Sequence, residues 1–325
     1  MIQEARCSGL WPIHLQPKNP TMDKKLVVTV CPNGTIITRD QNPKQPYTPK
    51  QVAEQAVAAF KEGAVEAHFH ARDAEGYSLS DAEPYIETIE LISKECPDMI
   101  MCPSISITPK KAGGGLYEVE TTQTMIEDLV KRGKQFIETT IITPVSYISP
   151  RPIKPGEQQA PGSTVTREKM VAETEFLQSK GIKPDYMCHN IEGIENVKEW
   201  IIEPGIYQKP HLLCLGHGMH KPSIQTYPDP WGMIYLMTMI QYLPKDCVWG
   251  ASIGGRNWLP MTVLAIMLGV SYIRVGMEDA SWLYPHKNDL IESNAQVTRK
   301  VVTIARELGR EIATPAEARA ILGIK

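Results

Sequence analysis

Gly63-Ala64-Val65-Glu66-Ala67-His68-Phe69-His70-Ala71-Arg72-Asp73 is the stretch that decides the fold and locates its chemistry. Its apolar first half predicts a buried β-strand, in which successive side chains point to opposite faces. His68 and His70 therefore point the same way. Two imidazoles that converge at the end of a buried strand form half of a site for Zn²⁺ or another transition metal, which needs one or two further His, Asp or Glu ligands.

A second stretch near the far end strengthens this interpretation. A single His-x-His also occurs as hydrogen-bonded core or loop histidines, so the pair alone does not define a metal site. Arg274-Val275-Gly276-Met277-Glu278-Asp279 ends another buried strand with two carboxylates. Carboxylate oxygens would complete the ligand set that the two histidines begin.

Strand and helix patterns alternate from Lys25 onward. Thr48-Pro49 is typical of a helix start, with Thr as the cap and Pro in the first turn. Strands are expected at 26–31, 64–70, 98–104, 135–142, 184–189, 210–216, 246–252 and 271–276, and helices at 48–63, 83–95, 119–132, 167–180, 193–203, 230–242, 259–268 and 288–308. Eight such units predict an α/β protein with a closed (β/α)8 TIM barrel. The alternative, an open doubly wound sheet, is disfavoured by the strand count and by the absence of a GxGxxG turn.

Composition limits the classes of function. Residues 25–325 are expected to form one barrel domain and residues 1–24 an N-terminal arm. The formal net charge of −3 indicates no basic face for nucleic acid. No run approaches the roughly 18 to 20 apolar residues of a membrane helix. Seven cysteines without CxxC spacing predict free thiols and a cytoplasmic protein.

A barrel carries its chemistry at the carboxyl ends of its strands, so polar residues and glycines there are candidates for binding substrate. Glycines bring backbone amides close to a ligand, and hydroxyl, imidazole, amide and guanidinium groups hydrogen-bond to it. The candidates are Asn33, Ser104, Ser106, Gly114 in a triple-glycine loop, Thr139, His217 and Arg256.

Several motifs in this order resemble those of the β-keto acid cleavage enzymes, a family of zinc-dependent (β/α)8 proteins. They are the stretch around His68, Trp249-Gly250-Ala251-Ser252-Ile253-Gly254-Gly255-Arg256, the stretch around Glu278, and the tail Ala313-Thr314-Pro315-Ala316-Glu317-Ala318-Arg319. The resemblance spans about residue 25 to the end. HxHxRD, GxxxGGR and RxGxED occurring together form a far more specific signal than any one of them.

The resemblance implies that a β-keto acid and acetyl-CoA, the co-substrate, exchange to give acetoacetate and a new acyl-CoA. It also implies that His68, His70 and Glu278 bind the metal, which is Zn²⁺ or another divalent transition metal. Arg274 would orient the substrate carboxylate or the developing charge, and Ser104 would hydrogen-bond that carboxylate. Removing a proton between two carbonyls also needs a nearby base, for which Asp279 is the candidate.

Two departures from the type member of that family bear on the substrate. Members that act on an amino-keto acid are expected to place acidic residues where our alignment puts Ile36 and Met187. An unpaired ammonium buried there would cost on the order of 2 to 5 kcal/mol. The substrate is therefore expected to lack a cationic amine. Glu192 and His189 would substitute if the register of the fifth strand differs by a few residues.

Two other classes of function stay open at this point. A metal-dependent hydrolase of the amidohydrolase type also combines a barrel with HxH, although that superfamily carries HxH on its first strand. A non-catalytic barrel would have little reason to hold both histidines and both carboxylates. A homo-oligomer, with a tetramer as the specific expectation, is suggested by Trp11, Trp258, Trp282 and the proline-rich arm. The resemblance further implies a role in amino-acid degradation.

Overall fold

Eight parallel strands form the centre of the molecule. The computed structural model describes residues 22–79, 81–105, 119–133, 136–146, 165–218 and 231–325. The strands are β1 (Val27–Val30), β2 (Glu66–Phe69), β3 (Ile100–Pro103), β4 (Thr139–Ile142), β5 (Lys183–Cys188), β6 (His211–His217), β7 (Cys247–Ile253) and β8 (Tyr272–Val275). They pair in the order β3-β2-β1-β8-β7-β6-β5-β4. Because the Glu138 N–H donates to the Met101 carbonyl at 3.1 Å, the two outer strands also meet and the sheet forms the predicted barrel.

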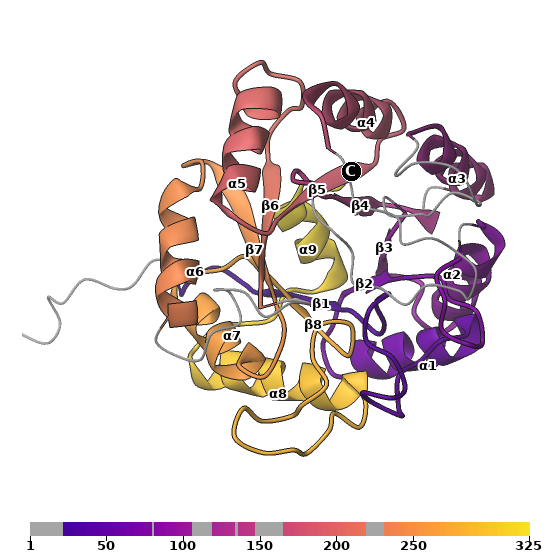
Figure 1. The fold of residues 1–325 in the computed structure, drawn as a ribbon, viewed down its shortest axis with the longest axis vertical. Helices are drawn as coiled ribbons and strands as arrows, with labels where there is room; N and C mark the ends of the chain where they lie inside the picture. The colour runs from indigo at the N-terminus through magenta and orange to yellow at the C-terminus, as the bar shows by residue number, and fades with distance from the viewer. Residues whose placement is uncertain (1–21, 80, 106–118, 134–135, 147–164, 219–230) are drawn as a thin grey trace, which may run out of the picture.

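A ring of helices surrounds the strands (Figure 1). They are α1 (Pro49–Phe60), α2 (Glu83–Glu95), α3 (Val119–Arg132), α4 (Arg167–Ser179), α5 (Ile191–Val197) with a π-helical turn at Lys198–Ile202, α6 (Trp231–Tyr242), α7 (Trp258–Met267), α8 (Asn294–Glu307) and α9 (Pro315–Leu322). The predicted start of α1 is confirmed, since the Thr48 hydroxyl accepts from the Gln51 N–H and Pro49 is the first helical residue.

Two helical segments differ from the prediction. The helix expected at 288–308 begins only at Asn294, because the Ser293 side chain caps it by accepting from the Gln296 N–H. Residues 288–293 instead belong to the loop that follows β8. The short helix α9 was not predicted, although Thr314 and Glu317 form a capping box there and Pro315 opens the helix.

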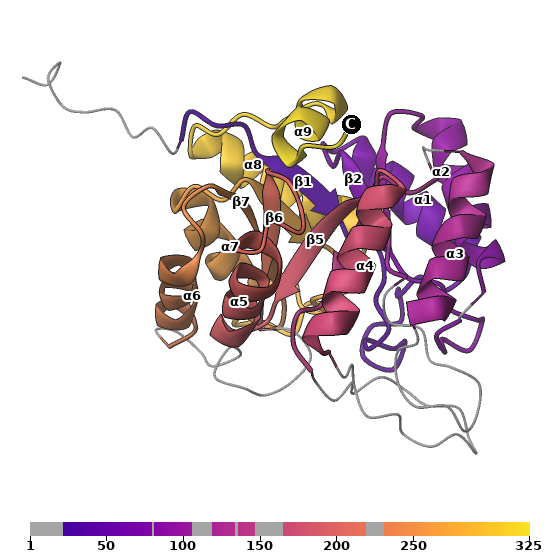
Figure 2. The ribbon, with the colours of Figure 1, turned by 90° about the horizontal axis from the view of Figure 1, so that it is seen from above.

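Helix α9 closes the amino-terminal end of the barrel. Ala318 and Leu322 pack with Val27, Val65 and Ile100 in an apolar cluster inside the ring of strands. Figure 2 shows α9 at one end of the molecule, and in Figure 1 it lies at the middle of the barrel, behind the strands. Just before this helix, the backbone extends the sheet alongside the start of β1. The Leu26 N–H donates to the Glu311 carbonyl at 2.8 Å, and the Ala313 N–H donates to the Leu26 carbonyl at 2.9 Å.

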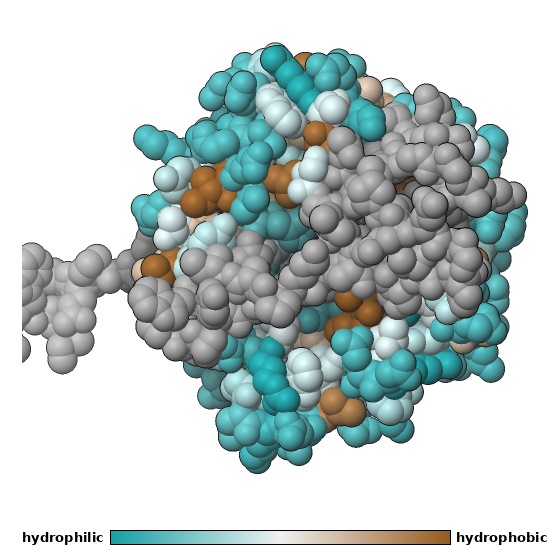
Figure 3. Space-filling model, viewed as in Figure 1, coloured by the Kyte–Doolittle hydropathy of each residue, from teal (hydrophilic) through white to brown (hydrophobic). Residues whose placement is uncertain are grey.

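A larger apolar cluster lies between the strands and the outer helices, with Ile89, Leu213, Trp258 and Val301 among its fully buried members. The described part of the face in Figure 3 is mostly hydrophilic, with small apolar groups scattered over it. Among the residues that the structure describes, no helix is both long enough and apolar enough to cross a membrane.

Candidate metal centre and active site

Three buried side chains converge at the carboxyl end of the barrel. His68 lies on β2, His70 directly follows that strand, and Glu278 follows β8 by three residues. The Nε2 atom of His70 lies 3.2 Å from Oε1 of Glu278, and the Nε2 atom of His68 lies 3.6 Å from Oε2. One donor atom from each residue falls within 4.8 Å of the others. The strand alternation that predicted a common direction for the two histidines is present in the structure.

The charges around these side chains suit metal ligands. Burial alone raises the pKa of Glu278, but the Arg274 cation and the two imidazoles hold it well below its usual range. Burial, together with Arg274, lowers the pKa of His68 well below its usual value. Glu278 is therefore ionised and His68 neutral near pH 7, which are the protonation states that coordinate a metal.

Two thiols contact side chains of this region: one contacts a member of the cluster, and the other contacts the neighbouring Arg274. The Cys102 Sγ lies 3.4 Å from Nδ1 of His68, which leaves the Nε2 atom of that ring facing Glu278. The Arg274 Nε–H donates to Cys31 Sγ at 3.1 Å. These contacts fix the rotations of a ligand side chain and of the neighbouring cation.

The residues present fit a divalent transition metal. Two imidazole nitrogens and one carboxylate are a donor set that Zn²⁺ and Fe²⁺ sites use. Nη2 of Arg274 and Oε2 of Glu278 lie 3.1 Å apart as an ion pair, yet neither atom makes an aligned hydrogen bond although both are buried. Buried oxygens normally have a hydrogen-bond partner, so this oxygen has bonding capacity left for a further ligand.

Asp279 lies beside the cluster and is held by a residue that sequence reasoning did not select. The Ser252 hydroxyl donates to Oδ2 of Asp279 at 2.9 Å, while Oδ1 is buried without a hydrogen-bond partner. Burial and the Glu278 carboxylate raise the pKa of Asp279 to about 7. A carboxyl with one free oxygen next to the ligand cluster is suited to exchanging a proton with a bound molecule.

The two described candidates that carry a hydroxyl, Ser104 and Thr139, lie at different depths in the barrel. Ser104 directly follows β3, is buried, and lies next to the end of β2, since its N–H donates to the Phe69 carbonyl at 2.9 Å. Thr139 is the first residue of β4, paired with Lys183 at the start of β5, so it lies deeper in the barrel than the strand ends. The expected strand at 135–142 and β4 end at the same residue, so Thr139 lies three residues before the carboxyl end of the strand. Thr143 is the buried polar residue that follows it.

Two other candidates use their polar groups within the protein. Asn33 is buried and bonds to the backbone of His70 through both atoms of its side-chain amide. The Arg256 guanidinium donates to the Lys287 carbonyl and to Oδ1 of Asn288, both at 2.7 Å, and stacks on Trp282. Both residues lie at the predicted end of the barrel, but they hold neighbouring loops.

The structure does not bring His217 to the ligand cluster. Leu213 and Leu215 point toward the outer helices, and His217 continues this outward alternation, with its ring 6.0 Å from that of Tyr235 on α6. The inward position at the end of β6 is Gly216, where an added Cβ would lie 2.5 Å from Nδ1 of His189. Ser106 and Gly114 lie outside the described residues.

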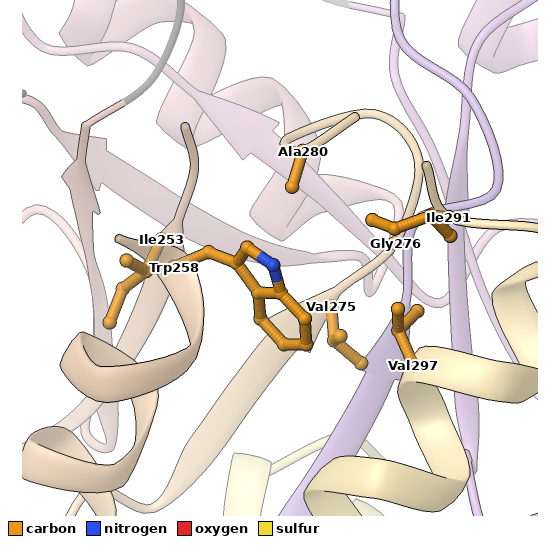
Figure 4. A pocket seen from close by; sticks show the side chains of 7 residues that line it. All are labelled: Ile253, Trp258, Val275, Gly276, Ala280, Ile291 and Val297. Atoms are coloured by element: carbon orange, nitrogen blue, oxygen red, sulfur yellow. The ribbon is translucent and has the colours of Figure 1, made fainter. Parts of the chain in front are cut away.

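The loop that carries Glu278 and Asp279 rests on an apolar base. Trp258 packs with Ile253, Val275 and Ile291 around a small apolar pocket between the ends of β7 and β8 and the start of α8 (Figure 4). The Trp258 indole N–H donates to the Trp282 carbonyl at 2.8 Å. This base and the Arg256 contacts restrict the movement of the loop.

The contact between Gly34 and Glu278 could not be predicted from sequence. Gly34 lies against Glu278, and an added Cβ would come within 2.5 Å of the Glu278 Cγ. No local pattern reports a contact between residues so far apart in the chain. Ser252 does carry a weak signal, because it is a polar residue at an inward position of a buried strand.

Comparisons with known proteins agree with this architecture. Residues 25–324 match the family model described as beta-keto acid cleavage enzyme. The chain is 30% identical over 306 residues to a 3-keto-5-aminohexanoate cleavage enzyme of Fusobacterium nucleatum, covering 94% of this chain and 100% of that one. It is 27% identical over 316 residues to a 3,5-dioxohexanoate:acetyl-CoA acetone transferase of Paraburkholderia graminis, covering 93% and 96%. The apo structure of ObcA superposes with a TM-score of 0.67 at 16% identity, covering 87% of this chain and 66% of that one, and shows the fold alone.

The fold is a parallel barrel, and its carboxyl end holds a candidate metal site formed by His68, His70 and Glu278, with Asp279 beside it. These features define the class of barrel enzymes that carry a metal site at the strand ends. Because the family model spans nearly the whole chain, this protein belongs to the beta-keto acid cleavage enzyme family. The family resemblance predicted from the motifs is confirmed, and the amidohydrolase alternative is not favoured.

Proposed function

We propose that this protein transfers an acyl group from a β-keto acid to CoA, using acetyl-CoA and releasing acetoacetate. The observation that carries the proposal is the buried cluster of His68, His70 and Glu278 beside Asp279, in a chain of this family. A β-keto acid must lose a proton from the carbon between its two carbonyls before that carbon can attack a thioester, and this cluster provides the groups for that step.

His68, His70 and Glu278 would hold a divalent transition metal, with Zn²⁺ as the specific proposal. When bound, such an ion acts as a Lewis acid toward the keto and carboxylate oxygens of the substrate and stabilises the negative charge that develops there. Glu278 supplies a negative charge to the ligand set, and the buried Arg274 balances it. These side chains are buried, so their charges act strongly on a substrate.

Asp279 takes the proton in this proposal. Its Oδ1 is the free oxygen, and Ser252 holds the other oxygen so that the carboxyl keeps one orientation. Arg274 orients the substrate carboxylate or the developing charge, and Ser104 hydrogen-bonds that carboxylate. The wider set that we propose around the substrate is Asn33, Ser106, Gly114, Thr139, His217 and Arg256. Of these, Asn33 and Arg256 act through the loops that they hold, and Thr139 and His217 act from outside the ligand cluster.

The carbanion of the β-keto acid then attacks the carbonyl carbon of acetyl-CoA, and the CoA thiolate leaves. The thiolate attacks the original keto carbon of the resulting diketo acid, which breaks the adjacent carbon–carbon bond. Acetoacetate and a new acyl-CoA are the products, and Asp279 returns its proton to the carbon that it deprotonated. One proton is removed and one is returned, so the exchange needs no further reactant.

The proposed substrate lacks a cationic amine. Met187 is buried and packs inside the barrel with Cys214 rather than presenting a carboxylate there. Burial lowers the pKa of His189 to about 4, so this neighbouring imidazole is neutral near pH 7. Neither group offers a negative charge to an ammonium, whose burial without a partner is costly.

An exchange assay tests the function. Metal-loaded protein is mixed with acetyl-CoA and with neutral, anionic or cationic β-keto acids, and acetoacetate and the new acyl-CoA are detected by mass. We expect both products from a neutral or anionic acid, and a loss of about 100- to 10,000-fold in the Asp279→Asn variant. Absence of products across the panel, with metal bound, would overturn the function. Comparable turnover of a cationic acid would overturn only the substrate class.

We further propose that the protein is cytoplasmic and forms a homo-oligomer, specifically a tetramer. Each subunit would consist of an N-terminal arm at 1–24 and a barrel domain at 25–325. The six described cysteines are all free, which suits a reducing compartment. Ile234, Met237 and Tyr242 of α6 and Met267 of α7 are exposed apolar side chains, of the kind that subunit contacts bury. Mass photometry of the full chain tests the assembly.

A further inference from the structure

The turn that follows β1 contributes no metal ligand, yet it contacts two of the three proposed ligands. Its residues are Pro32, Asn33 and Gly34, and all three are buried. The contacts run through Asn33 to His70 and through Gly34 to Glu278. The inference drawn from them rests on the metal centre of the proposed function.

Asn33 continues the sheet where its backbone pairing ends. The last paired residues of β1 and β2 are Val30 and Ala67. Beyond them, the Asn33 Oδ1 accepts from the His70 N–H, and the Asn33 Nδ2 donates to the His70 carbonyl, both at 3.0 Å. A side-chain amide thus replaces the neighbouring strand and holds the backbone of His70 at both of its polar groups. This keeps the His70 ring on the same inward face as that of His68.

Gly34 sets the position of Glu278 from the other side. A Cβ built on Gly34 would lie 2.5 Å from Cγ of Glu278 and 3.3 Å from its Cβ and Cδ. Any larger residue must therefore displace the carboxylate. The backbone of Glu278 is held by the same segment, because its N–H donates to the Cys31 carbonyl at 3.1 Å.

The turn itself is fixed by Arg72, a fully buried residue of the loop after β2. Its Nη1 donates to the carbonyls of Gly34 and Ile37, both at 2.8 Å, and its Nε donates to the Gly76 carbonyl at 2.7 Å. The guanidinium also stacks on the Tyr47 ring at 4.1 Å. One cation therefore ties the loops after β1 and β2 together, and the turn cannot move independently of the histidines.

We propose that Asn33 and Gly34 are positioning residues of the metal centre, which set the separation of His70 from Glu278 and thereby the affinity for the metal. Neither residue touches the metal or the substrate. Their effect is on how well three ligands from distant parts of the chain are arranged before the metal arrives.

Metal binding, measured apart from activity, tests this inference. The Zn²⁺ dissociation constant is determined by competition with a chelating dye, and the visible spectrum of Co²⁺-loaded protein reports the ligand arrangement. We expect Asn33→Ala and Gly34→Ala each to weaken Zn²⁺ binding by about 10- to 100-fold and to change the Co²⁺ spectrum. Asn33→Asp keeps the size but turns a carboxylate oxygen toward the His70 carbonyl, which repels it, so this variant is expected to disturb the Co²⁺ spectrum at least as much as Asn33→Ala, and it carries the test if Asn33→Ala fails to fold.

Two matched controls separate positioning from stability. Asn196→Ala removes a comparable bond, from Nδ2 to the Pro144 carbonyl at 2.8 Å, that involves none of the proposed metal ligands. Gly205→Ala strains a turn with a φ of +72° where nothing lies within 4 Å of an added Cβ. Both controls are expected to bind Zn²⁺ within twofold of the wild type, even if their melting temperatures fall.

The outcomes distinguish this inference from the proposed function. Zn²⁺ binding within threefold of the wild type in folded Asn33→Ala and Gly34→Ala would overturn the inference and leave the metal centre standing. If His70→Ala keeps the full metal content of the wild type, the metal centre itself falls, and the inference with it.

Discussion

The two ends of the barrel both bury charged residues, but they treat them differently. At the amino-terminal end, Arg319 of α9 makes two bonds to the carboxylate of Glu138, at 2.7 and 2.9 Å, and Arg310 donates to three backbone carbonyls. At the carboxyl end, Oε2 of Glu278 and Oδ1 of Asp279 are buried without an aligned hydrogen bond. One end satisfies these charged groups within the chain, and the other keeps polar atoms available for a ligand.

This difference separates stability from chemistry. Groups that are fully bonded within the protein stabilise the fold, whereas buried polar atoms without partners cost free energy unless something binds them. Such atoms in a native structure are concentrated at functional sites. Substitutions at the two ends should therefore affect different measurements.

His70→Ala should give the largest effect at the carboxyl end. Loss of one ligand from a set of three should abolish metal binding and lower kcat/KM by at least about 1,000-fold. The core of this barrel does not depend on the ion, so circular dichroism and the melting temperature should stay near those of the wild type. His286→Ala, an exposed histidine of the same end, should keep both metal and activity. An insoluble His70→Ala chain would instead indicate a structural metal.

Asp185→Asn tests the interior between the two ends. Burial raises the pKa of Asp185 from 3.8 to about 6, and the Tyr272 hydroxyl donates to its carboxylate. The folded protein then holds a proton that the unfolded chain releases near pH 4. The associated stability is present below that pH and is lost as pH rises through about 6, by about 3 kcal/mol in all.

The measurement is the free energy of urea unfolding at pH 5 and pH 7.5. Between these values the wild type should lose about 1 kcal/mol more than Asp185→Asn, which cannot titrate. Parallel changes in the two proteins would contradict the raised pKa.

Arg319→Ala tests the amino-terminal end. It leaves the Glu138 carboxylate largely buried without its cation, so the free energy of unfolding should fall by about 2 kcal/mol, a value reduced for the partial exposure of Arg319. The activity of the folded fraction should not change. Lys131→Ala breaks the exposed pair with Asp128, which water screens, so its free energy of unfolding should match that of the wild type. An equal loss of unfolding free energy in Arg319→Ala and Lys131→Ala would mean that the pair of Arg319 and Glu138 stabilises the amino-terminal end no more than an exposed pair does.

Ser252→Ala should have the smallest effect. It frees the Asp279 carboxyl to rotate and should lower kcat by about tenfold, with KM and metal content little changed. Steady-state kinetics with the preferred β-keto acid checks this. An unchanged kcat would mean that Asp279 is held adequately by its backbone bond to Gly255.

The fold was predictable because its signals are local. Alternating buried strands and amphipathic helices occur in the order of a barrel, and helices α2 and α3 have the predicted bounds. Residues 288–293 were predicted as helix but belong to the loop after β8, because the helix begins at the cap of Ser293 and the loop is held by contacts with Trp258 and Arg256. Helix α9 had the same start signal as α1, but its place across the barrel end depends on strands far away in the chain.

The arrangement of the candidate site was predictable in part for a similar reason. His68 and His70 share a face by strand periodicity, and barrel topology brings β8, with Glu278, next to β1 and close to β2. The contacts of Asn33, Gly34 and Ser252 depend on side chains that meet only in the folded protein. A position at the strand ends indicates that a residue is close to the site, but not whether its polar groups face the substrate or the backbone.

The pairing of Leu26 with Glu311 and Ala313 has a consequence for how the protein is made. Strand β1 leaves the ribosome early, but its neighbour β8 and the segment that covers its start lie some 245 to 285 residues later. At ordinary synthesis rates, β1 has one side without its partner for on the order of ten to fifty seconds. The nascent chain therefore presents an open sheet edge throughout elongation, and chaperones that shield such edges should matter more for its yield than for its final stability.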